Sequence, residues 1–167
     1  VVQVRRDSDD DLKSFTADEV ADGDVADWVN DVALPLDTAS GAAAAYSLRN
    51  LSTSYSGDVV DVRRSSDDTE ASFTAAEVAD GTLVDWVGAG DDGFVTQWYD
   101  QSGNANHAVQ STPSSQPKIV DGGTLVSGGL EFDGVDDRMT CASLYSADLS
   151  VFTKLNISNS DSTSNFM

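Results

Sequence analysis

A long internal repeat constrains this chain more than any other feature of its sequence. Residues 1–29 match residues 59–87 at a constant offset of 58 positions, with 20 identities in 29 positions and no gap. Agreement of this length indicates a duplication. The residues before the second copy have no counterpart before the first, so we expect the chain to begin inside a longer protein. We assign residues 1–31 to a partial repeat unit and residues 36–167 to the main domain.

Each copy of the repeat predicts a strand, a turn and a short helix. In the second copy VVDVRR alternates apolar and polar residues, which predicts a strand with Val60 and Val62 facing one way. SSDD then predicts a turn. The aspartates of this turn lie next to an arginine pair in both copies, so we expect local charge pairing there and no metal site.

The helices of the repeat have recognisable boundaries. Thr74 stands three positions before Glu77, the spacing of a capping box at a helix start, and Thr16 and Glu19 repeat it. A second short helix is expected to follow Asp80-Gly81 and to end at Gly88 or Gly90. Apolar neighbours at helical spacing predict that the tryptophans of the two copies are core anchors, rather than aromatic platforms for a ligand; these are Trp28 and Trp86.

The remainder of the chain reads mainly as strands. A short helix is predicted between the two copies, over Gly41 to Leu51. From Gly93 onward, short apolar runs alternate with turns rich in Gly, Ser, Asp and Asn. This pattern favours a mainly β chain, an antiparallel β-sandwich or jelly-roll fragment with short helices. The expected strands are FVTQWYDQ, HAVQS, PKIV, GLEFDG, DRMTCASL and SVFTKLNI. They are too few to close two sheets, so we expect truncation at the C-terminal end.

The charge and the cysteine content exclude several kinds of site. The chain holds 29 acidic and 9 basic residues, a net charge of −20. Such a charge repels phosphate backbones, so we expect no nucleic-acid partner. No apolar run approaches the roughly 18 residues of a membrane span, so no membrane insertion is expected. Cys141 is the only cysteine, which excludes an intrachain disulfide, and it is predicted to be a small buried hydrophobe in a strand.

An ordered series of motifs resembles two kinds of known domain. AAAAYSLRNLSTSYSGDVVDVRRSSDDTEASF, TQWYDQSGNANHAVQ and GLEFDGVDD resemble the front of the catalytic domain of α-L-arabinofuranosidase B. YSLR, VRRSSD, WYDQSGN, QPKIV and FDG in order are also similar to concanavalin A-like, laminin G-like domains of marine phage structural and tail proteins. The resemblance covers roughly residues 36 to 145, and both families imply a concanavalin A-like sandwich.

The resemblance to the enzyme does not carry over its catalytic residues. That family places its nucleophile and acid carboxylates downstream of the shared region, and neither matches a position in this chain. Cleavage of a glycoside needs two carboxylates that flank the bond. Asp100, Glu131 and Asp133 stand at predicted strand ends, but nothing in their spacing pairs them. We therefore assign no catalytic residue, and we interpret Asp100 as a turn former that accepts backbone N–H bonds.

Two groups of residues are candidates for ligand binding. The turn after the Trp-Tyr strand could present a sugar-binding surface, with Tyr99, Asp100, Asn104 and His107 as its candidate ligand-binding residues. In FDGVDD, the aspartates Asp133, Asp136 and Asp137 could ligate Ca²⁺, which prefers several oxygen ligands on flexible loops. A solvated turn is the competing interpretation of this second group, because its spacing is not that of a calcium loop.

These observations lead to three hypotheses for function. The first is a non-enzymatic structural or attachment module on a virion or another extracellular surface. It would bind other copies of itself, virion proteins or cell-surface polysaccharide. The second is the front portion of an α-L-arabinofuranosidase-like glycoside hydrolase. The third is a shell or fibre subunit without a ligand.

Overall fold

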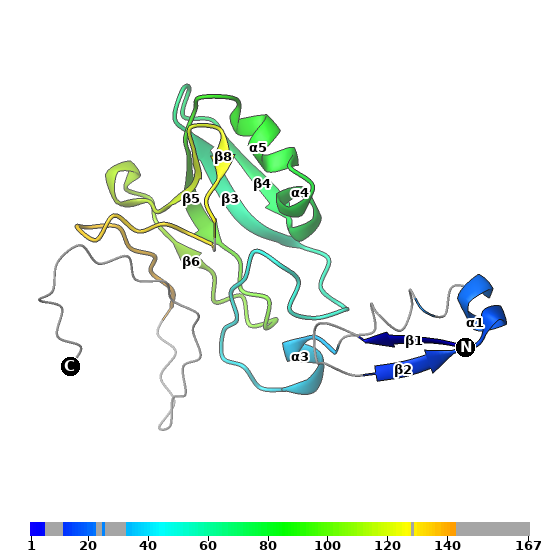
Figure 1. Cartoon of the computed structure of the whole chain (residues 1–167). Coiled ribbons are helices and arrows are strands. Elements are labelled where there is room, and N and C mark those ends of the chain that lie inside the picture. Colours follow the sequence, from blue (N-terminus) through cyan, green and yellow to red (C-terminus); the bar gives the residue numbers. More distant parts are fainter. Residues whose placement is uncertain (6–11, 23–24, 26–32, 128, 143–167) are drawn as a thin grey trace, which may run out of the picture.

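The chain is mainly β, with antiparallel sheets and few short helices, which is consistent with the predicted β-sandwich fold. The computed structural model describes residues 1–5, 12–22, 25, 33–127 and 129–142. Its strands form a sheet of two strands and a sheet of six (Figure 1). The strands are β1 (Val2–Arg5), β2 (Leu12–Phe15), β3 (Asp58–Arg64), β4 (Glu70–Thr74), β5 (Gly93–Trp98), β6 (Ala108–Val109), β7 (Lys118–Asp121) and β8 (Thr124–Leu125). The helices are α1 (Ala17–Asp22), α3 (Pro35–Thr38), α4 (Ala75–Ala79) and α5 (Thr82–Val87), with a 3₁₀ turn at Pro113–Ser115.

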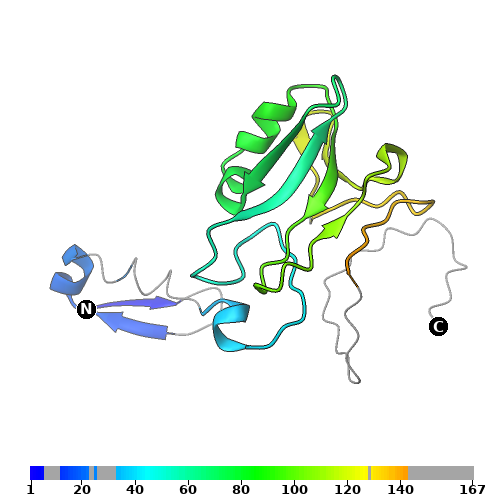
Figure 2. The ribbon, with the colours of Figure 1, turned by 180° about the vertical axis from the view of Figure 1, so that it is seen from behind.

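The six-stranded sheet is built around β3 and β5. Its strand order is β4-β3-β5-β7-β8, and β6 also pairs with β5. All of these pairings are antiparallel, and Val62 of β3 lies between Ala71 of β4 and Val95 of β5. The view from behind shows the same sheet with the two short helices along its flank (Figure 2). This sheet carries the elements that position the candidate sites.

The core lies between this sheet and helices α4 and α5. It contains Val59, Val60, Val62, Phe73, Val78, Leu83, Val87, Val95, Ile119 and Val120. The predicted capping box is confirmed, because Thr74 and Glu77 exchange hydrogen bonds at the start of α4. The predicted second helix is α5, and Gly88 is its C-cap. Trp86 packs against the core and meets Phe73 edge to face at 5.3 Å, as expected of a core anchor, whereas Trp28 lies outside the described residues.

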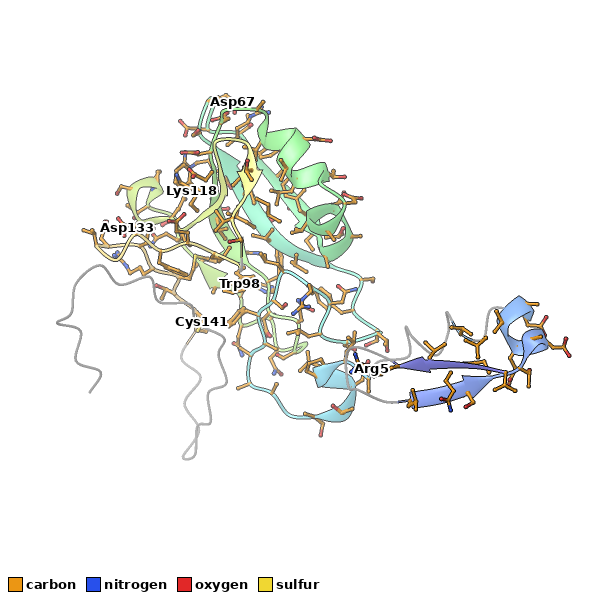
Figure 3. All side chains as sticks on the ribbon, viewed as in Figure 1. Arg5, Asp67, Trp98, Lys118, Asp133 and Cys141 are labelled. Carbon is orange, nitrogen blue, oxygen red and sulfur yellow. The ribbon has the colours of Figure 1, made fainter. Side chains whose placement is uncertain are left out.

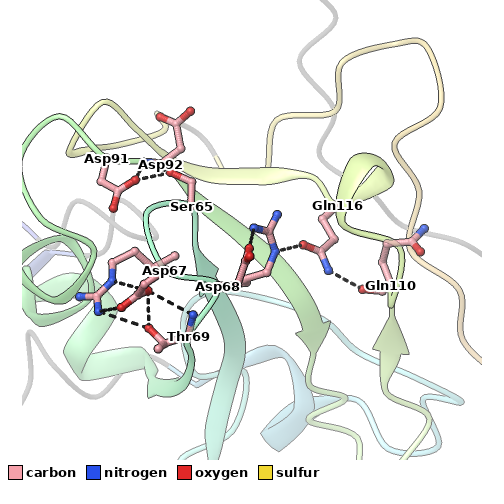
Figure 4. Close-up of polar contacts among 10 residues, drawn as sticks. Ser65, Asp67, Asp68, Thr69, Asp91, Asp92, Gln110 and Gln116 are labelled. Carbon is pink, nitrogen blue, oxygen red and sulfur yellow. Dashed lines mark hydrogen bonds and ion pairs between the residues drawn. The ribbon is translucent and has the colours of Figure 1, made fainter.

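The predicted charge pairing is confirmed in the second copy. Arg64 Nη2 lies 2.6 Å from Asp67 Oδ2, and Arg63 Nη1 lies 2.8 Å from Asp68 Oδ1 (Figure 4). Hydrogen bonds from Arg64 and Thr69 hold the pKa of Asp67 well below its usual range. The aspartates of the SSDD turn are therefore satisfied by local partners. Their counterparts in the first copy lie outside the described residues.

The helix predicted over Gly41 to Leu51 is wrong. This segment is irregular, although its alanines favour a helix. Its backbone groups bond instead to the turn after β5: Gln101 N–H donates to Ala45 O at 2.8 Å, and Leu51 N–H donates to Gln101 Oε1 at 2.8 Å. These long-range bonds satisfy groups that a helix would otherwise pair, and tertiary contacts thus override local propensity.

The predicted strands after Gly93 are present in part. FVTQWYDQ, HAVQS and PKIV contain β5, β6 and β7, whereas β8 is a strand that the sequence did not predict. Among the residues that the structure describes, GLEFDG and DRMTCASL contribute isolated bridges, Lys118 with Glu131 and Val109 with Thr140. Cys141 is partly exposed and follows the second bridge, so its prediction as a buried strand residue is wrong. SVFTKLNI lies outside the described residues.

The helices of the described segments are all short. None of them is long and apolar enough to cross a membrane.

Candidate functional site

The turn after β5 is organised around the carboxylate of Asp100. Asp100 is buried, with 3% of its surface exposed, and both of its oxygens accept hydrogen bonds. Oδ1 accepts from the backbone N–H groups of Ala45 and Ser102, each at 2.8 Å. Oδ2 accepts from Ser102 Oγ at 2.8 Å and from the backbone N–H of Asn106 at 3.0 Å. The carboxylate thus ties the turn to the irregular segment 41–51.

These bonds decide the charge of Asp100. Burial raises its pKa, but hydrogen bonds from the backbone of Ser102, Ala45 and Asn106 and from the Ser102 hydroxyl outweigh burial and leave the pKa below its usual value. A proton donor in glycoside cleavage needs a raised pKa and access to the substrate. Asp100 has neither property, so its environment favours a structural role.

The other predicted residues of this turn are also engaged within the chain. Tyr99 OH donates to the Asp61 carboxylate at 3.0 Å, and its ring meets His107 edge to face at 5.0 Å. His107 Nδ1 accepts from the backbone N–H of Asp100 at 3.0 Å. The exposed Asn104 donates from Nδ2 to Ala42 O at 2.8 Å. The structure therefore brings all four predicted residues together, but in bonds that hold the turn.

A pocket that Phe94 of β5 lines gathers the remaining candidate carboxylates. It is lined by Phe94, Pro113, Ser114, Gln116, Lys118, Glu131, Asp133 and Asp137. Figure 3 places Lys118 and Asp133 on one side of the molecule, well away from Arg5 on the hairpin. Glu131 reaches the pocket through the bridge to β7, in which Lys118 N–H donates to Glu131 O at 2.9 Å. We call this the Phe94 pocket.

The three predicted calcium ligands cluster together, and two of them, Asp133 and Asp137, line the Phe94 pocket. Asp133, Asp136 and Asp137 each offer an oxygen within 4.8 Å of the others. Asp133 Oδ1 accepts backbone N–H bonds from the residues that follow it, including Val135 at 2.9 Å, and these bonds lower its pKa. Asp136 accepts from Ser115 Oγ at 2.8 Å. Carboxylate oxygens of this cluster already accept backbone N–H bonds within the turn. A turn held by its own hydrogen bonds therefore accounts for the geometry, and calcium binding stays a prediction.

Two cationic side chains lie close to the ring of Phe94, which lines the pocket. The Arg63 guanidinium lies 5.0 Å and Lys118 Nζ 5.8 Å from the Phe94 ring centroid. Lys118 also pairs with Asp121 at 2.7 Å and with Asp92 at 3.2 Å, and both partners raise its pKa. The pocket thus combines an aromatic ring, fixed cations and exposed carboxylates, a set that can hydrogen-bond a polyhydroxylated ligand.

Buried glutamines support this pocket and were missed by the sequence analysis. Gln116 Oε1 accepts from Arg63 Nε at 2.8 Å, and Gln116 Nε2 donates to Gln110 O at 2.9 Å (Figure 4). Gln110 Nε2 in turn donates to Arg138 O at 3.0 Å. Gln110 follows β6 and Gln116 precedes β7, and neither position carries a local signal of burial, so only the fold could reveal this network.

The carboxylates of the Phe94 pocket do not form a recognisable catalytic pair. Asp133 and Asp137 come from one turn, Glu131 lies two residues before Asp133, and catalysis requires two carboxyl groups on opposite sides of the scissile bond. The arrangement among the described residues is therefore that of a polar binding surface on a β scaffold. The fold is that of a mainly β domain, consistent with the β-sandwich class.

Comparison with known proteins identifies the family. The family model of the alpha-L-arabinofuranosidase B catalytic domain matches residues 35–127, more than half of the chain, and the chain belongs to this family. The alpha-L-arabinofuranosidase B of Aspergillus niger is 40% identical over 74 residues, which are 42% of this chain and 15% of that protein. The corresponding Aspergillus kawachii protein is 39% identical over the same shares. The chain thus aligns with only a small part of the curated relatives.

Two solved structures are similar to less than half of this chain. A GH54 α-L-arabinofuranosidase soaked with a cyclic sulfate inhibitor is 29% identical, with a TM-score of 0.37, over 47% of this chain and 19% of that one. An arabinofuranosidase in complex with arabinofuranosyl-α-1,2-xylobiose is 35% identical, with a TM-score of 0.34, over 42% of this chain and 16% of that one. The predicted resemblance to α-L-arabinofuranosidase B is confirmed. The predicted resemblance to concanavalin A-like domains of phage proteins stays a prediction.

Proposed function

We propose that this chain is part of a glycoside hydrolase domain that acts on α-L-arabinofuranosyl groups, and that it supplies scaffold and sugar contacts. One observation carries the proposal: the family match over residues 35–127 spans the whole six-stranded sheet, from β3 to β8. The match therefore follows a structural unit rather than a short motif. This proposal is the second of the three hypotheses that the sequence raised, and the family membership favours it over the first.

The Phe94 pocket is the proposed contact surface for the sugar. Arabinofuranosyl groups present several hydroxyls and an apolar ring face, which suit carboxylate acceptors beside an aromatic ring. Glu131 and Asp133 are exposed at this pocket, whereas Asp100 is buried and fully hydrogen-bonded. We assign Glu131 and Asp133 to ligand binding, and we assign the catalytic pair to neither of them.

Affinity electrophoresis of the chain in gels that contain branched arabinan tests this proposal. Retardation by branched arabinan, but not by unbranched xylan, is the expected result. The double variant Glu131→Gln, Asp133→Asn should lose the retardation, and the matched control Asp85→Asn, on an exposed helical position, should keep it. Equal migration in all gels would contradict the proposal. Cleavage is measured directly by the release of 4-nitrophenol from 4-nitrophenyl α-L-arabinofuranoside.

An attachment module without enzymatic activity is the second candidate function. The duplicated segment favours it, because repeats are more typical of arrays and stalks than of a single active site. This candidate retains the predicted virion or extracellular location and the predicted self-association. A glycan array distinguishes the two functions: binding restricted to arabinofuranosyl glycans supports the hydrolase proposal, and binding to unrelated surface glycans supports attachment.

A further inference from the structure

Three side chains form a row across neighbouring strands of the six-stranded sheet. Arg63 of β3 is the partner of Phe94 of β5, and Phe94 is the partner of Lys118 of β7. Side chains that lie opposite one another on adjacent strands share one face of a sheet and contact each other. The neighbours Val62 and Val95 point into the core, and successive side chains of a strand alternate between faces. The row therefore lies on the face opposite the core.

Arg63 supports the Phe94 ring although it is not one of the residues that line the pocket. Its guanidinium lies 5.0 Å from the ring centroid, a distance at which a cation and an aromatic ring attract each other. Only 11% of the Arg63 side chain is exposed. A guanidinium that is this far removed from solvent needs protein acceptors for its N–H groups, because water cannot supply them.

Gln116 is the buried acceptor for Arg63. Its Oε1 accepts from Arg63 Nε at 2.8 Å, and the residue is 3% exposed (Figure 4). Its Nε2 donates to Gln110 O at 2.9 Å, and this bond determines which end of the amide faces Arg63. Asp68 also accepts from Arg63, but its side chain is 78% exposed, and exposed ion pairs constrain geometry only weakly. Gln116 is therefore the partner that fixes the guanidinium.

We propose that Gln116 is a positioning residue of the Phe94 pocket: it fixes Arg63 against Phe94, and Arg63 in turn holds the aromatic ring in the orientation that receives a sugar. The sugar in this statement rests on the proposed function, whereas the position of the ring does not. An aromatic ring that is already held in place loses less conformational freedom when a ligand binds. Residues behind a binding site that lock the contacting side chain are the usual source of such rigidity.

The mobility of the Phe94 ring tests the proposal without a ligand. The chain is labelled with ¹³C in its phenylalanine rings, the Phe94→Leu spectrum identifies the Phe94 signals, and relaxation gives the order parameter of that ring. Gln116→Leu should lower this order parameter, because Arg63 Nε loses its acceptor. Gln116→Glu keeps an oxygen that can accept from Arg63, so it should retain most of the parent value.

Gln101→Leu is the matched control for a general loss of stability. Gln101 is 4% exposed, and its Oε1 accepts from the backbone N–H of Leu51 at 2.8 Å. The same substitution therefore removes an equally buried amide, but from the turn after β5 and away from the residues that line the pocket. It should lower the urea midpoint as Gln116→Leu does and leave the Phe94 order parameter unchanged. Equal loosening of Phe94 in the two variants would overturn the proposal.

Retardation in gels that contain branched arabinan measures the consequence for binding. Gln116→Leu should raise the apparent dissociation constant about tenfold, and Gln101→Leu should leave it unchanged. Arg63→Lys keeps the positive charge but loses the planar group with its Nε donor, so it should weaken binding to a similar extent. Adding Gln116→Leu to Arg63→Lys should cause little further loss, because both residues act through one contact. Additive losses would contradict a role of Gln116 through Arg63.

The two measurements separate the failure of this proposal from the failure of the proposed function. A parent chain that branched arabinan does not retard would refute sugar binding, and the order parameter of Phe94 would then decide the positioning role alone. An unchanged order parameter in Gln116→Leu would overturn the proposal whatever the gels show. Arg63→Lys leaves the buried amide in place, so it decides the matter if Gln116→Leu does not fold: a Phe94 ring as rigid as in the parent chain would again overturn the proposal.

Discussion

The carboxylate of Asp100 accepts a hydrogen bond of 2.8 Å from the backbone N–H of Ala45, which lies 55 residues earlier in the chain. This contact joins the turn after β5 to the alanine-rich segment before β3. It explains why that segment is not helical, and it explains why a buried aspartate remains charged. Both consequences can be measured.

Replacement of Asp100 by asparagine should destabilise the fold. The amide group cannot accept at both positions, so at least one backbone N–H of Ala45, Ser102 or Asn106 loses its partner in a buried site. The expected loss is about 2–3 kcal/mol in the free energy of unfolding, measured by urea denaturation. Asp85→Asn, at an exposed helical position, is the control and should change stability by less than about 0.5 kcal/mol. Equal effects of the two variants would contradict the structural role of Asp100.

The contribution of Asp100 should depend on pH in one direction. Its folded-state pKa lies below its unfolded value of about 3.9, so the native state favours the ionised form. This stabilisation is present above the unfolded pKa and is lost as the pH falls through the lower folded pKa. The stability difference between the parent chain and Asp100→Asn should therefore shrink below about pH 4. Repulsion within the acidic chain changes almost equally in both proteins, so the difference isolates Asp100.

A matched pair of glycine substitutions should separate backbone strain from crowding. Gly123 and Gly103 both have positive φ, +82° and +88°. A Cβ at Gly123 would lie 2.9 Å from Gly88 O, whereas nothing lies within 4 Å of a Cβ at Gly103. Gly103→Ala should cost about 1–2 kcal/mol from its backbone conformation alone, and Gly123→Ala about 1–3 kcal/mol more. Thermal denaturation measures both, and similar costs would contradict the close approach at Gly123.

The two capping boxes should contribute differently to global stability. Thr74→Ala removes the cap of α4, whose Val78 is buried in the core, and should cost about 1 kcal/mol. Thr16→Ala removes the matching cap of α1, in which no residue is buried. Its effect on the unfolding of the main sheet should lie within about 0.5 kcal/mol. Equal losses would mean that the first copy unfolds together with the six-stranded sheet.

Local sequence signals predicted the parts of the fold that depend on neighbouring residues. The capping box at Thr74 and Glu77, the turn at SSDD and the strand around Val62 each follow from a few adjacent side chains, and each is present. The helix over Gly41 to Leu51 failed because distant hydrogen-bond partners outweighed alanine propensity. The strand β8 was missed because two residues that pair beside β7 carry no periodic pattern.

The candidate sites were predictable only as sets of residues. The sequence identified Tyr99, Asp100, Asn104 and His107 as neighbours in a turn, but it could not show that their polar atoms are occupied by segment 41–51 and by Asp61. It identified the FDGVDD aspartates, but it could not place Phe94 and Lys118 beside them. Hydrogen-bond partners separated by tens of residues leave no local trace in composition or spacing.

The sequence by itself determined the duplication, the strand and cap chemistry of each copy, and the family to which the chain belongs. Tertiary structure alone decided that Val60 and Val78 of one copy are buried while their counterparts Val2 and Val20 in the other are exposed. The physical reason is that nearly identical segments share the same local energies. Their burial depends on whether a third strand reaches the edge, and only the long-range path of the chain supplies that strand.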